Sequence, residues 1–302
     1  MAGSDQSRPL ATIMDTVTCN GMRGEVVRME LGGQGFGAMR LRERDDDPDP
    51  DRDPVAVIHA ALDAGISLVD TADAYRNEEL VGRAVRSRRD ELVLASKFGL
   101  VWHGDVAGDF DVRADPAYVR EAAEASLRRL GVDVIDLYYL HHRSETTPIE
   151  DTVAAMAELV DRGVVRALGL SNVTAEDLRR AHAVHPITAL QERWSLLERD
   201  IERELVPAAA DLGVTIVAHS PTDHGLLHRN PDSGAVVDIA RAHDVTPGQV
   251  ALAWVHHRNR AHDVEVVPLP GTTSVHHLHA NVATQDLELT DEELRALNTL
   301  GG

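Results

Sequence analysis

The sequence predicts an α/β fold, a single-domain (β/α)8 TIM barrel, and three observations favour this class. Short runs rich in Val, Ile and Leu alternate with amphipathic stretches along the 302 residues. Glycines follow several of the amphipathic stretches, where helices commonly end. Aromatic residues make up only 3% of the chain, so the core must be aliphatic. The interior of a parallel barrel is filled mainly by such branched side chains.

Eight apolar runs are the candidate strands, and their near-continuous apolar character is typical of strands buried on both faces. In chain order they are Val27–Leu31, Ile66–Asp70, Leu92–Ser96, Val134–Leu140, Ala167–Leu170, Ala189–Gln191, Val214–Ala218 and Val264–Val267. A doubly wound open sheet is the alternative. Its Gly-rich turn would be residues 32–37, which lack the G-x-G-x-x-G spacing of a dinucleotide-binding turn.

Helices are expected between these runs. Pro116–Leu130 has Asp115 as a candidate N-cap and Gly131 just beyond its end. A further helix starts near Ser274, and Thr174 with Asp177 forms a capping-box pattern. The other predicted helices are Ile149–Arg162, Thr174–Val184, Ile201–Leu212, Gln249–His257 and Asp291–Leu297.

The domain organisation follows from the segments in which this alternation of predicted strands and helices is missing. We expect residues 1–24 to form a flexible leader and residues 25–302 to form the barrel. The acidic, Pro-rich segment Glu43–Pro54 is read as a solvated connection. A cation-binding role is the alternative, but the segment lacks the glycine of an EF-hand loop.

Charge and cysteine content limit the partners and the compartment. The 30 basic and 50 acidic residues give a net charge of -20, which disfavours binding to nucleic acid or to an anionic membrane. Cys19 is the single cysteine, so no internal disulfide forms and a reducing compartment is expected. The polar start of the chain and the lack of a long apolar run argue against a signal peptide or a membrane span. We expect a cytoplasmic protein, and the sequence leaves its oligomeric state open.

Polar side chains gather at the expected carboxyl ends of three consecutive strands, where barrel active sites lie. The second strand ends at Asp70 and is followed by Tyr75, the third is followed by Lys97, and the fourth by His141. Each side chain alone has an ordinary structural explanation, such as a turn cap or a surface lysine. Their convergence on one barrel end indicates a catalytic set.

These residues lie within motifs through which the sequence resembles the aldo-keto reductase family over about residues 25–300. The motifs are Asp70-Thr71-Ala72-x-x-Tyr75, Ser96-Lys97, Asp136-Leu137-Tyr138-x-x-His141, Leu168-Gly169-Leu170-Ser171-Asn172, Gln191, Ser220-Pro221 and Pro268-x-Pro270-Gly271-Thr272.

The resemblance implies an enzyme that reduces an aldehyde or ketone to an alcohol with hydride from a nicotinamide cofactor. It implies that Tyr75 is the general acid, that Lys97 lowers its pKa and that Asp70 anchors Lys97. His141 would orient the substrate carbonyl. The chemistry is consistent, because an unperturbed tyrosine is a poor acid at pH 7 and a nearby ammonium favours the tyrosinate.

The resemblance also implies a cofactor site, with NADP(H) as the first expectation and NAD(H) as the alternative. Its predicted residues bind the nicotinamide, the phosphates and the adenine: Ser171, Asn172, Gln191, Trp194, Ser220, Pro221, Thr222, Leu226, Gly271, Thr272, Ser274, His277 and Asn281. Members that favour NADPH usually carry Lys or Arg beside Gly271 or at the position of His277. No Lys or Arg occurs here from Val264 to Asp286, so the usual basic side chain that binds the 2′-phosphate is missing. His219 also replaces the aromatic residue that is common before Ser220.

A small-molecule carbonyl compound is the expected partner, and Phe36, Trp102 and Trp194 are the predicted walls of its pocket. Which carbonyl compound it is cannot be predicted, because specificity in barrels lies in the loops. No metal is expected, since His277 and His279 lack further ligands nearby. The alternative function is a non-catalytic, cofactor-binding regulatory subunit of the same fold. The intact set of Asp70, Tyr75, Lys97 and His141 argues against it.

Overall fold

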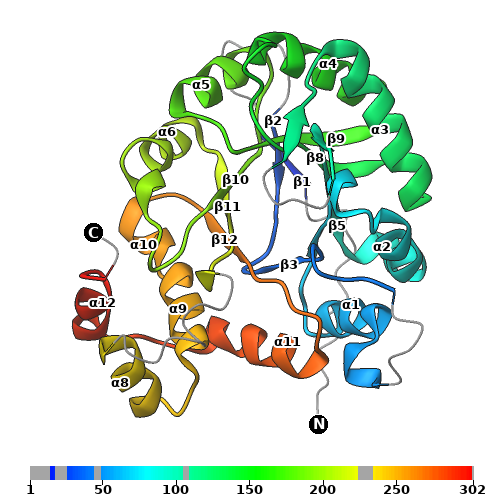
Figure 1. Cartoon of the computed structure of the whole chain (residues 1–302). Coiled ribbons are helices and arrows are strands. Elements are labelled where there is room, and N and C mark those ends of the chain that lie inside the picture. The colour runs from blue at the N-terminus through cyan, green and yellow to red at the C-terminus, as the bar shows by residue number, and fades with distance from the viewer. Residues whose placement is uncertain (1–13, 18–25, 44–48, 105–108, 224–233, 301–302) are drawn as a thin grey trace.

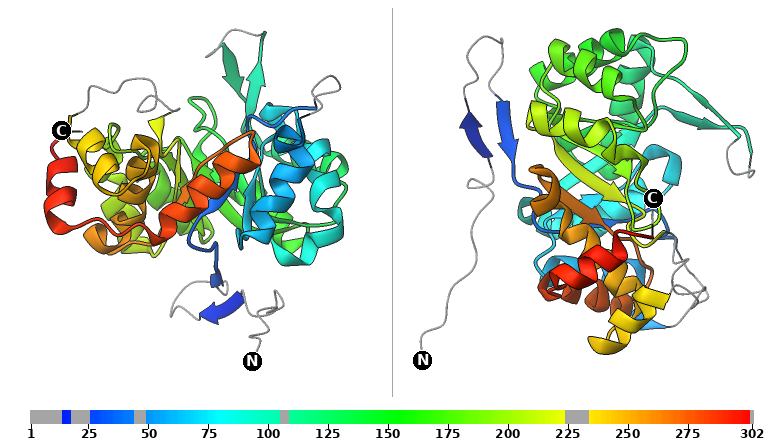
Figure 2. Two further views of the ribbon diagram at one scale, coloured as in Figure 1. Left: turned by 90° about the horizontal axis from the view of Figure 1, so that it is seen from below. Right: turned by 90° about the vertical axis from the view of Figure 1, so that its left-hand side faces the viewer.

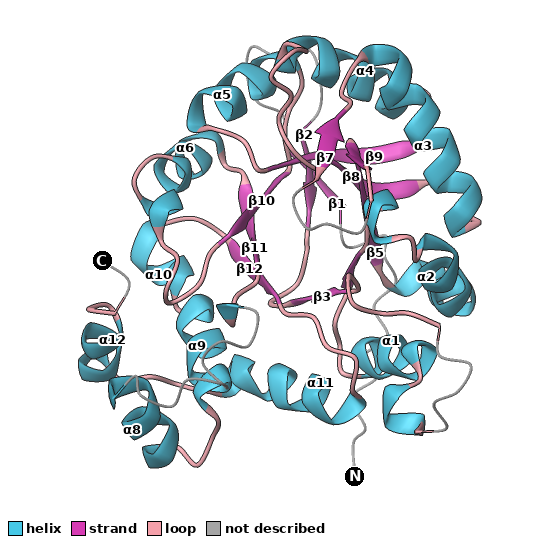
Figure 3. Cartoon of the chain, viewed as in Figure 1, coloured by secondary structure: helices cyan, strands magenta, loops and turns pink. Residues whose placement is uncertain are grey.

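The computed structural model describes residues 14–17, 26–43, 49–104, 109–223 and 234–300. Eight parallel strands form one sheet that curls into a nearly closed barrel, and helices surround it, as Figures 1 and 3 show. In sheet order the strands are β3 (Gly35–Gly37), β4 (Leu68–Asp70), β5 (Val93–Phe98), β8 (Ile135–Leu140), β9 (Val165–Ser171), β10 (Ala189–Arg193), β11 (Thr215–His219) and β12 (Val266–Leu269). The predicted (β/α)8 barrel is confirmed. Its last and first strands meet where the Gly37 amide donates to the Pro270 carbonyl at 3.1 Å.

The prediction of the first barrel strand was wrong. Residues 27–29 of that predicted strand belong to β2 (Val26–Met29), which pairs antiparallel with β1 (Met14–Val17) in a separate two-stranded sheet. The first barrel strand is β3, whose Gly-Phe-Gly sequence has low strand propensity. A Cβ atom at Gly35 would lie 2.7 Å from a methyl group of Leu269, so the close approach of β3 requires this glycine. β1 lies within the segment predicted as a leader, and the flexibility of that leader stays a prediction.

The predicted helices are present. The described α-helices are α1 (Pro54–Asp63), α2 (Glu78–Val85), α3 (Pro116–Leu130), α4 (Ile149–Asp161), α5 (Ala175–Val184), α6 (Leu205–Leu212), α8 (Gly234–Ala242), α9 (Pro247–His256), α10 (Arg258–His262), α11 (Val275–Val282) and α12 (Asp291–Leu297). Short 3-10 helices are η2 (Pro50–Arg52), η3 (Asp73–Tyr75), η4 (Arg86–Glu91), η5 (Asp200–Glu202) and η7 (Ala283–Asp286). Asp115 caps α3, and the expected capping box of Thr174 and Asp177 starts α5.

The core has two layers, because successive strand residues point to opposite faces of the sheet. The larger layer fills the space between the sheet and the surrounding helices. The smaller layer fills the barrel and is made of Met29, Leu31, Leu68, Val93, Ala95, Leu137, Tyr139, Ala167, Ala189, Val217, Val267 and Leu269. Both layers are largely aliphatic, as the low aromatic content required.

Two hairpins mark the two ends of the barrel, as both views in Figure 2 show. The β1–β2 hairpin lies at the end where the strands begin. The other hairpin, β6 (Leu100–Trp102) with β7 (Phe110–Val112), follows β5 and projects from the end where the strands finish. This second hairpin was not predicted from the sequence. No helix in the described part of the chain is both long and apolar enough to cross a membrane.

Candidate active site

The inward-facing positions of the barrel change from apolar to polar at the carboxyl ends of the strands. On β4 the inward Leu68 is followed two residues later by Asp70, and on β5 the inward Ala95 is followed by Lys97. The same step leads to His141 just after β8, Ser171 on β9, Gln191 on β10 and His219 on β11. The period of two therefore delivers six polar side chains to one end of the barrel.

Lys97 is the centre of this group. Its side chain is 0% exposed, and its ammonium forms an ion pair with Asp70. The ammonium also donates to the Thr71 carbonyl at 2.9 Å and to the Tyr75 hydroxyl at 3.3 Å. The second carboxylate oxygen of Asp70 accepts from the Gln191 amide at 2.9 Å. Burial alone would lower the pKa of Lys97, but Asp70 and Tyr75 outweigh it and hold that pKa above its usual value.

Tyr75 is carried by η3, which directly follows β4 and ends at Arg76 in the left-handed conformation. Its ring is partly exposed, so its hydroxyl can meet both Lys97 and a bound molecule. Burial raises the pKa of Tyr75, and the Lys97 ammonium opposes this without cancelling it. The expected net lowering of the Tyr75 pKa is therefore not found. Tyr75 holds its proton at neutral pH, as a general acid must before it acts.

His141 completes the set. Its ring lies 5.6 Å from the Tyr75 ring at an interplanar angle of 84°. Burial, helped by the positive charge of Lys97, lowers the pKa of His141 well below its usual value, so the imidazole is neutral at pH 7. Its Nδ1 is buried and has no hydrogen-bond partner among the described residues. A neutral imidazole has one donor and one acceptor nitrogen, so the ring beside Tyr75 can form a hydrogen bond with a bound molecule.

The residues predicted to bind the nicotinamide lie beside this set. The Asn172 amide donates to the His141 carbonyl at 2.9 Å and to the Ser171 hydroxyl at 3.0 Å. Asn172 has a positive φ of 52°, which marks the sharp turn after β9. Glu192, which the sequence analysis did not single out, accepts the next backbone N–H, that of Val173, at 2.9 Å. Burial raises the pKa of Glu192 to about 7.

The predicted phosphate-binding residues lie in the loops after β11 and β12. Ser220 and Thr222 belong to a turn closed by a bond from the Asp223 N–H to the Ser220 carbonyl at 2.9 Å. Asp223 pairs with Arg193, so the negative charge that Asp223 brings to this loop is matched. Pro221 is buried in the same turn, while Gly271, Thr272, Ser274, His277 and Asn281 follow β12 up to α11. The predicted residue Leu226 lies outside the described residues.

The structure places Trp194 and Phe36 away from the site, and both predictions need correction. Gln191 faces into the barrel, so Trp194 three residues later faces outward, where it is 0% exposed in the outer core. Its indole N–H donates to Glu202 at 3.0 Å and its ring lies 5.5 Å from His262. Phe36 points outward between two inward glycines and is 1% exposed in the same core. Neither ring can present a face to a cofactor or a substrate.

Trp102, the third predicted pocket residue, is partly exposed on the β6–β7 hairpin at the correct end of the barrel. Its ring packs edge-on against Phe110 at 5.3 Å, and Phe110 lies 5.9 Å from His142, the neighbour of His141. Trp102 and Phe110 thus form an apolar wall next to the catalytic set. Phe110 was not predicted, because the hairpin that pairs its strand with residues 100–102 was not predicted from the sequence.

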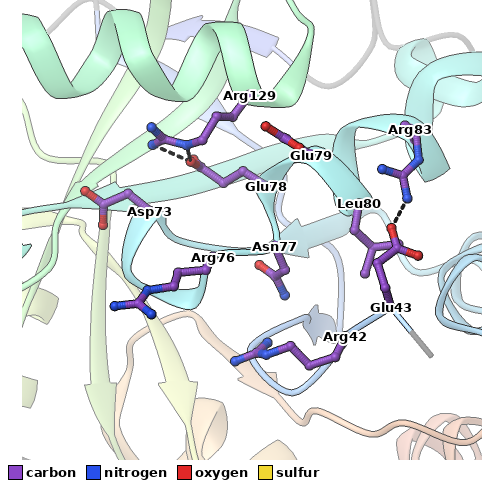
Figure 4. A pocket seen from close by; sticks show the side chains of 10 residues that line it. All are labelled: Arg42, Glu43, Asp73, Arg76, Asn77, Glu78, Glu79, Leu80, Arg83 and Arg129. Carbon is purple, nitrogen blue, oxygen red and sulfur yellow. Dashed lines mark hydrogen bonds and ion pairs between the residues drawn. The ribbon is translucent and has the colours of Figure 1, made fainter. Parts of the chain in front are cut away.

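A cavity of about 410 Å³ lies next to the site and is shown in Figure 4. It is lined by Arg42, Glu43, Asp73, Arg76, Asn77, Glu78, Glu79, Leu80, Arg83 and Arg129. None of the four catalytic candidates lines it, and four of its charged side chains pair with each other, Glu78 with Arg129 and Glu43 with Arg83. The convergence of Lys97, Tyr75 and His141 therefore identifies the site better than this cavity does. Among the described residues, no cluster of His, Cys, Asp or Glu could hold a metal ion.

Comparison with known proteins agrees with this geometry. The sequence pattern of the aldo/keto reductase family matches residues 35–301. The chain belongs to the aldo/keto reductase family. An oxidoreductase role follows from this membership.

Solved aldo-keto reductases share the fold over nearly the whole chain. A thermostable aldo-keto reductase in complex with the inhibitor epalrestat is 30% identical, with a TM-score of 0.76, covering 95% of this chain and 99% of that one. The glycerol dehydrogenase from Gluconobacter oxydans is 28% identical, also with a TM-score of 0.76, covering 95% of this chain and 94% of that one. An aldo-keto reductase from Klebsiella pneumoniae in complex with NADPH is 31% identical, with a TM-score of 0.75, covering 89% of this chain and 91% of that one.

The residues present in this aldo-keto reductase fit the nicotinamide end of such a cofactor. Asn172 and Gln191 bring amide groups, and Ser171 a hydroxyl, to the same barrel end as Tyr75 and Lys97. Amides and hydroxyls are the donors and acceptors that a carboxamide requires. The phosphate end is less favourable, because the chain has no Lys or Arg between residues 264 and 286.

Proposed function

We propose that this aldo-keto reductase reduces an aldehyde or ketone to an alcohol with Tyr75 as the general acid. The observation that carries the proposal is the contact between the Lys97 ammonium and the Tyr75 hydroxyl, which lie 3.3 Å apart. The same ammonium forms a buried ion pair with Asp70. A bound reduced nicotinamide would supply a hydride to the carbonyl carbon. The NADPH complex of the Klebsiella relative supports a nicotinamide dinucleotide as the cofactor.

The chain's own residues have separate tasks in this scheme. Tyr75 gives its proton to the carbonyl oxygen, and Lys97 stabilises the tyrosinate that forms. Asp70 keeps Lys97 charged, since a lone ammonium buried this deeply would lose its proton. The neutral imidazole of His141 donates a hydrogen bond to the same oxygen and orients it.

Lysine usage supports the role given to Lys97. It is the only lysine in the chain, and the other 29 basic residues are all arginine. A planar guanidinium suits surface ion pairs, whereas a compact ammonium fits a buried position and can approach one phenol oxygen closely. The single lysine of the chain therefore stands at the position where this chemistry needs a compact ammonium.

We also propose that Trp102 and Phe110 contact the apolar part of the substrate. Phe110 lies beside His142 at the open end of the barrel, and Trp102 packs against Phe110. The regulatory-subunit alternative gains no support from the site, because a subunit without chemistry need not keep the whole buried set.

The test measures turnover of a panel of aldehydes and ketones, with the loss of nicotinamide absorbance as the readout. Tyr75→Phe should lower kcat by about 10²- to 10⁴-fold and leave the cofactor Kd nearly unchanged. Tyr118→Phe is the matched control, because Tyr118 lies on α3 and stacks on Arg113 at 4.0 Å, outside the catalytic set. Full activity of Tyr75→Phe would refute the role of Tyr75, and no turnover with any carbonyl compound would favour the regulatory subunit.

A further inference from the structure

The N-terminus of α11 already holds an anion that belongs to the chain. α11 starts directly after the loop that follows β12, the eighth strand of the barrel. The N-terminus of such a helix is a frequent phosphate site in barrel enzymes. Here one carboxylate oxygen of Asp51 accepts from the Ser274 hydroxyl at 2.6 Å, and the other accepts from the His276 backbone N–H at 2.8 Å.

The contact joins segments that are far apart in sequence. Asp51 lies on η2, within the acidic segment 43–54, and η2 contacts α11. Figure 1 shows α1, which follows η2, lying alongside α11. Ser274 itself caps α11 by accepting from the His277 N–H at 3.2 Å, so its donor capacity is spent on Asp51. The segment that the sequence analysis read as a solvated connection therefore reaches the predicted phosphate site.

The charges around the N-terminus of α11 disfavour the binding of a second anion beside Asp51. The hydrogen bond from Ser274, followed by that from the His276 N–H, lowers the pKa of Asp51, so its carboxylate is charged at neutral pH. No Lys or Arg occurs between residues 264 and 286 to offset it. The nearby imidazoles of His276 and His277 are exposed. The guanidinium of Arg52, the residue next to Asp51 in sequence, lies 3.7 Å from the carboxylate of Asp49 and pairs with it.

We propose that Asp51 is a specificity-determining residue that rejects the 2′-phosphate of NADP(H), so that this aldo-keto reductase prefers NAD(H). The inference rests on the proposed function, because it concerns the cofactor of that same site. A 2′-phosphate beside Gly271 and His277 would meet the Asp51 carboxylate, with no Lys or Arg between residues 264 and 286 to offset the two negative charges. The 2′-hydroxyl of NAD(H) brings no charge and can instead donate a hydrogen bond to a carboxylate.

The test is a binding titration of purified, cofactor-free protein with NADH and with NADPH, read by calorimetry so that turnover is not needed. The wild-type chain should bind NADH at least about tenfold more tightly than NADPH at low ionic strength, and added salt should narrow that ratio. Asp51→Asn keeps an oxygen acceptor for the His276 N–H and removes the charge. It should tighten NADPH binding about tenfold and change NADH binding less than about twofold.

Two controls separate the local contact from other effects. Glu43→Gln removes one negative charge from the same acidic segment, and Glu43 pairs with Arg83 rather than with α11. It should leave the ratio of the two Kd values unchanged. Arg52→Gln tests the opposite idea, that Arg52 grips the 2′-phosphate, and selective weakening of NADPH binding in this variant would overturn the proposal. Asp51→Ser serves as a second neutral variant if Asp51→Asn does not fold.

The possible failures are distinguishable. If both dinucleotides bind and the wild-type chain prefers NADPH, or if neutral variants of Asp51 leave the ratio unchanged, the inference is wrong and the proposed function survives. If neither dinucleotide binds to any variant, the proposed function is wrong and the inference falls with it.

Discussion

Replacing Asp70 by asparagine should lower the pKa of Lys97, so that Lys97 loses its positive charge more easily. The titration of Lys97 itself reports this effect. In the wild-type chain Asp70 and Tyr75 outweigh burial and hold the pKa of Lys97 above 10.5. Without the carboxylate, burial dominates. Because the Lys97 side chain is 0% exposed, its pKa should fall well below its usual value. The Gln191 amide, which donates to Asp70 in the wild-type chain, would face the new side-chain amide and supply no charge.

Loss of that charge affects catalysis through Tyr75. Unit charges 3.3 Å apart at an effective dielectric of about 20 interact by roughly 5 kcal/mol, so the ammonium can contribute up to about 5 × 10³-fold to the rate of proton transfer. Lysine must be protonated to act in this way. The kcat of Asp70→Asn should therefore decline as pH rises through the lowered pKa, whereas wild-type kcat stays level there.

As pH rises, the stability of the Asp70→Asn variant changes in the opposite direction to its kcat. An unpaired buried ammonium costs about 3–5 kcal/mol, and the folded chain avoids part of this cost by releasing the proton. Because the unfolded chain then binds more protons, the unfolding free energy of Asp70→Asn should rise with pH between the lowered pKa and 10.5.

The assay uses the fact that Lys97 is the only lysine in the chain. Protein labelled isotopically in lysine gives one side-chain ammonium signal in an NMR titration. Asp136→Asn is the matched control, since Asp136 is a buried carboxylate paired with Arg89 and Arg166 rather than with Lys97. A Lys97 signal that titrates alike in Asp70→Asn and in the wild-type chain would refute the reasoning, as would a level kcat.

Three further predictions follow from other contacts. Burial raises the pKa of Glu192 from 4.5 to about 7, so the folded chain holds its proton more tightly and stability falls as pH rises through that window. Glu192→Gln should remove this decline, about 3 kcal/mol between about pH 4.5 and pH 7 in urea unfolding, and parallel pH curves would contradict it. Gly169→Ala would bring a Cβ to 2.3 Å from the Tyr139 ring and should cost about 1–3 kcal/mol, partly regained with Tyr139→Leu; an unchanged urea midpoint would disprove the close packing. Trp102→Ala should raise KM for apolar carbonyl compounds several-fold with little change in kcat, and an unchanged KM would remove Trp102 from the pocket.

The clustering of Asp70, Lys97 and His141 could be predicted from the sequence because it depends on local rules. Asp70, Lys97 and His141 each lie at the carboxyl end of a strand, and the two-residue alternation fixes which face they point to. The same rule indicates His219 from Val217, and it places Trp194 outward from Gln191. The misassignment of Trp194 was therefore avoidable, since the sequence carries the signal.

Other features could not be predicted, for physical reasons. β3 has two glycines in three residues, so neither propensity nor an apolar run marks it, and its place is set by how closely it packs on Leu269. The contact of Asp51 with Ser274 spans 223 positions in sequence. Nothing in the composition of an acidic, Pro-rich segment shows which of its carboxylates will meet a helix N-terminus.

Net charge alone does not explain the proposed cofactor preference. A chain with net charge -20 repels both NADH and NADPH at long range, but salt screens this repulsion beyond about 8 Å at physiological ionic strength. The two cofactors differ only at the 2′ position, so only charges within that distance of the 2′-phosphate can discriminate strongly between them. Asp51 is fixed by two hydrogen bonds at the helix start where that phosphate would lie, whereas Asp223, in the loop after β11, is matched by Arg193. The preference should therefore depend on the single carboxylate of Asp51 rather than on the acidic surface, which is why Glu43→Gln is the decisive control.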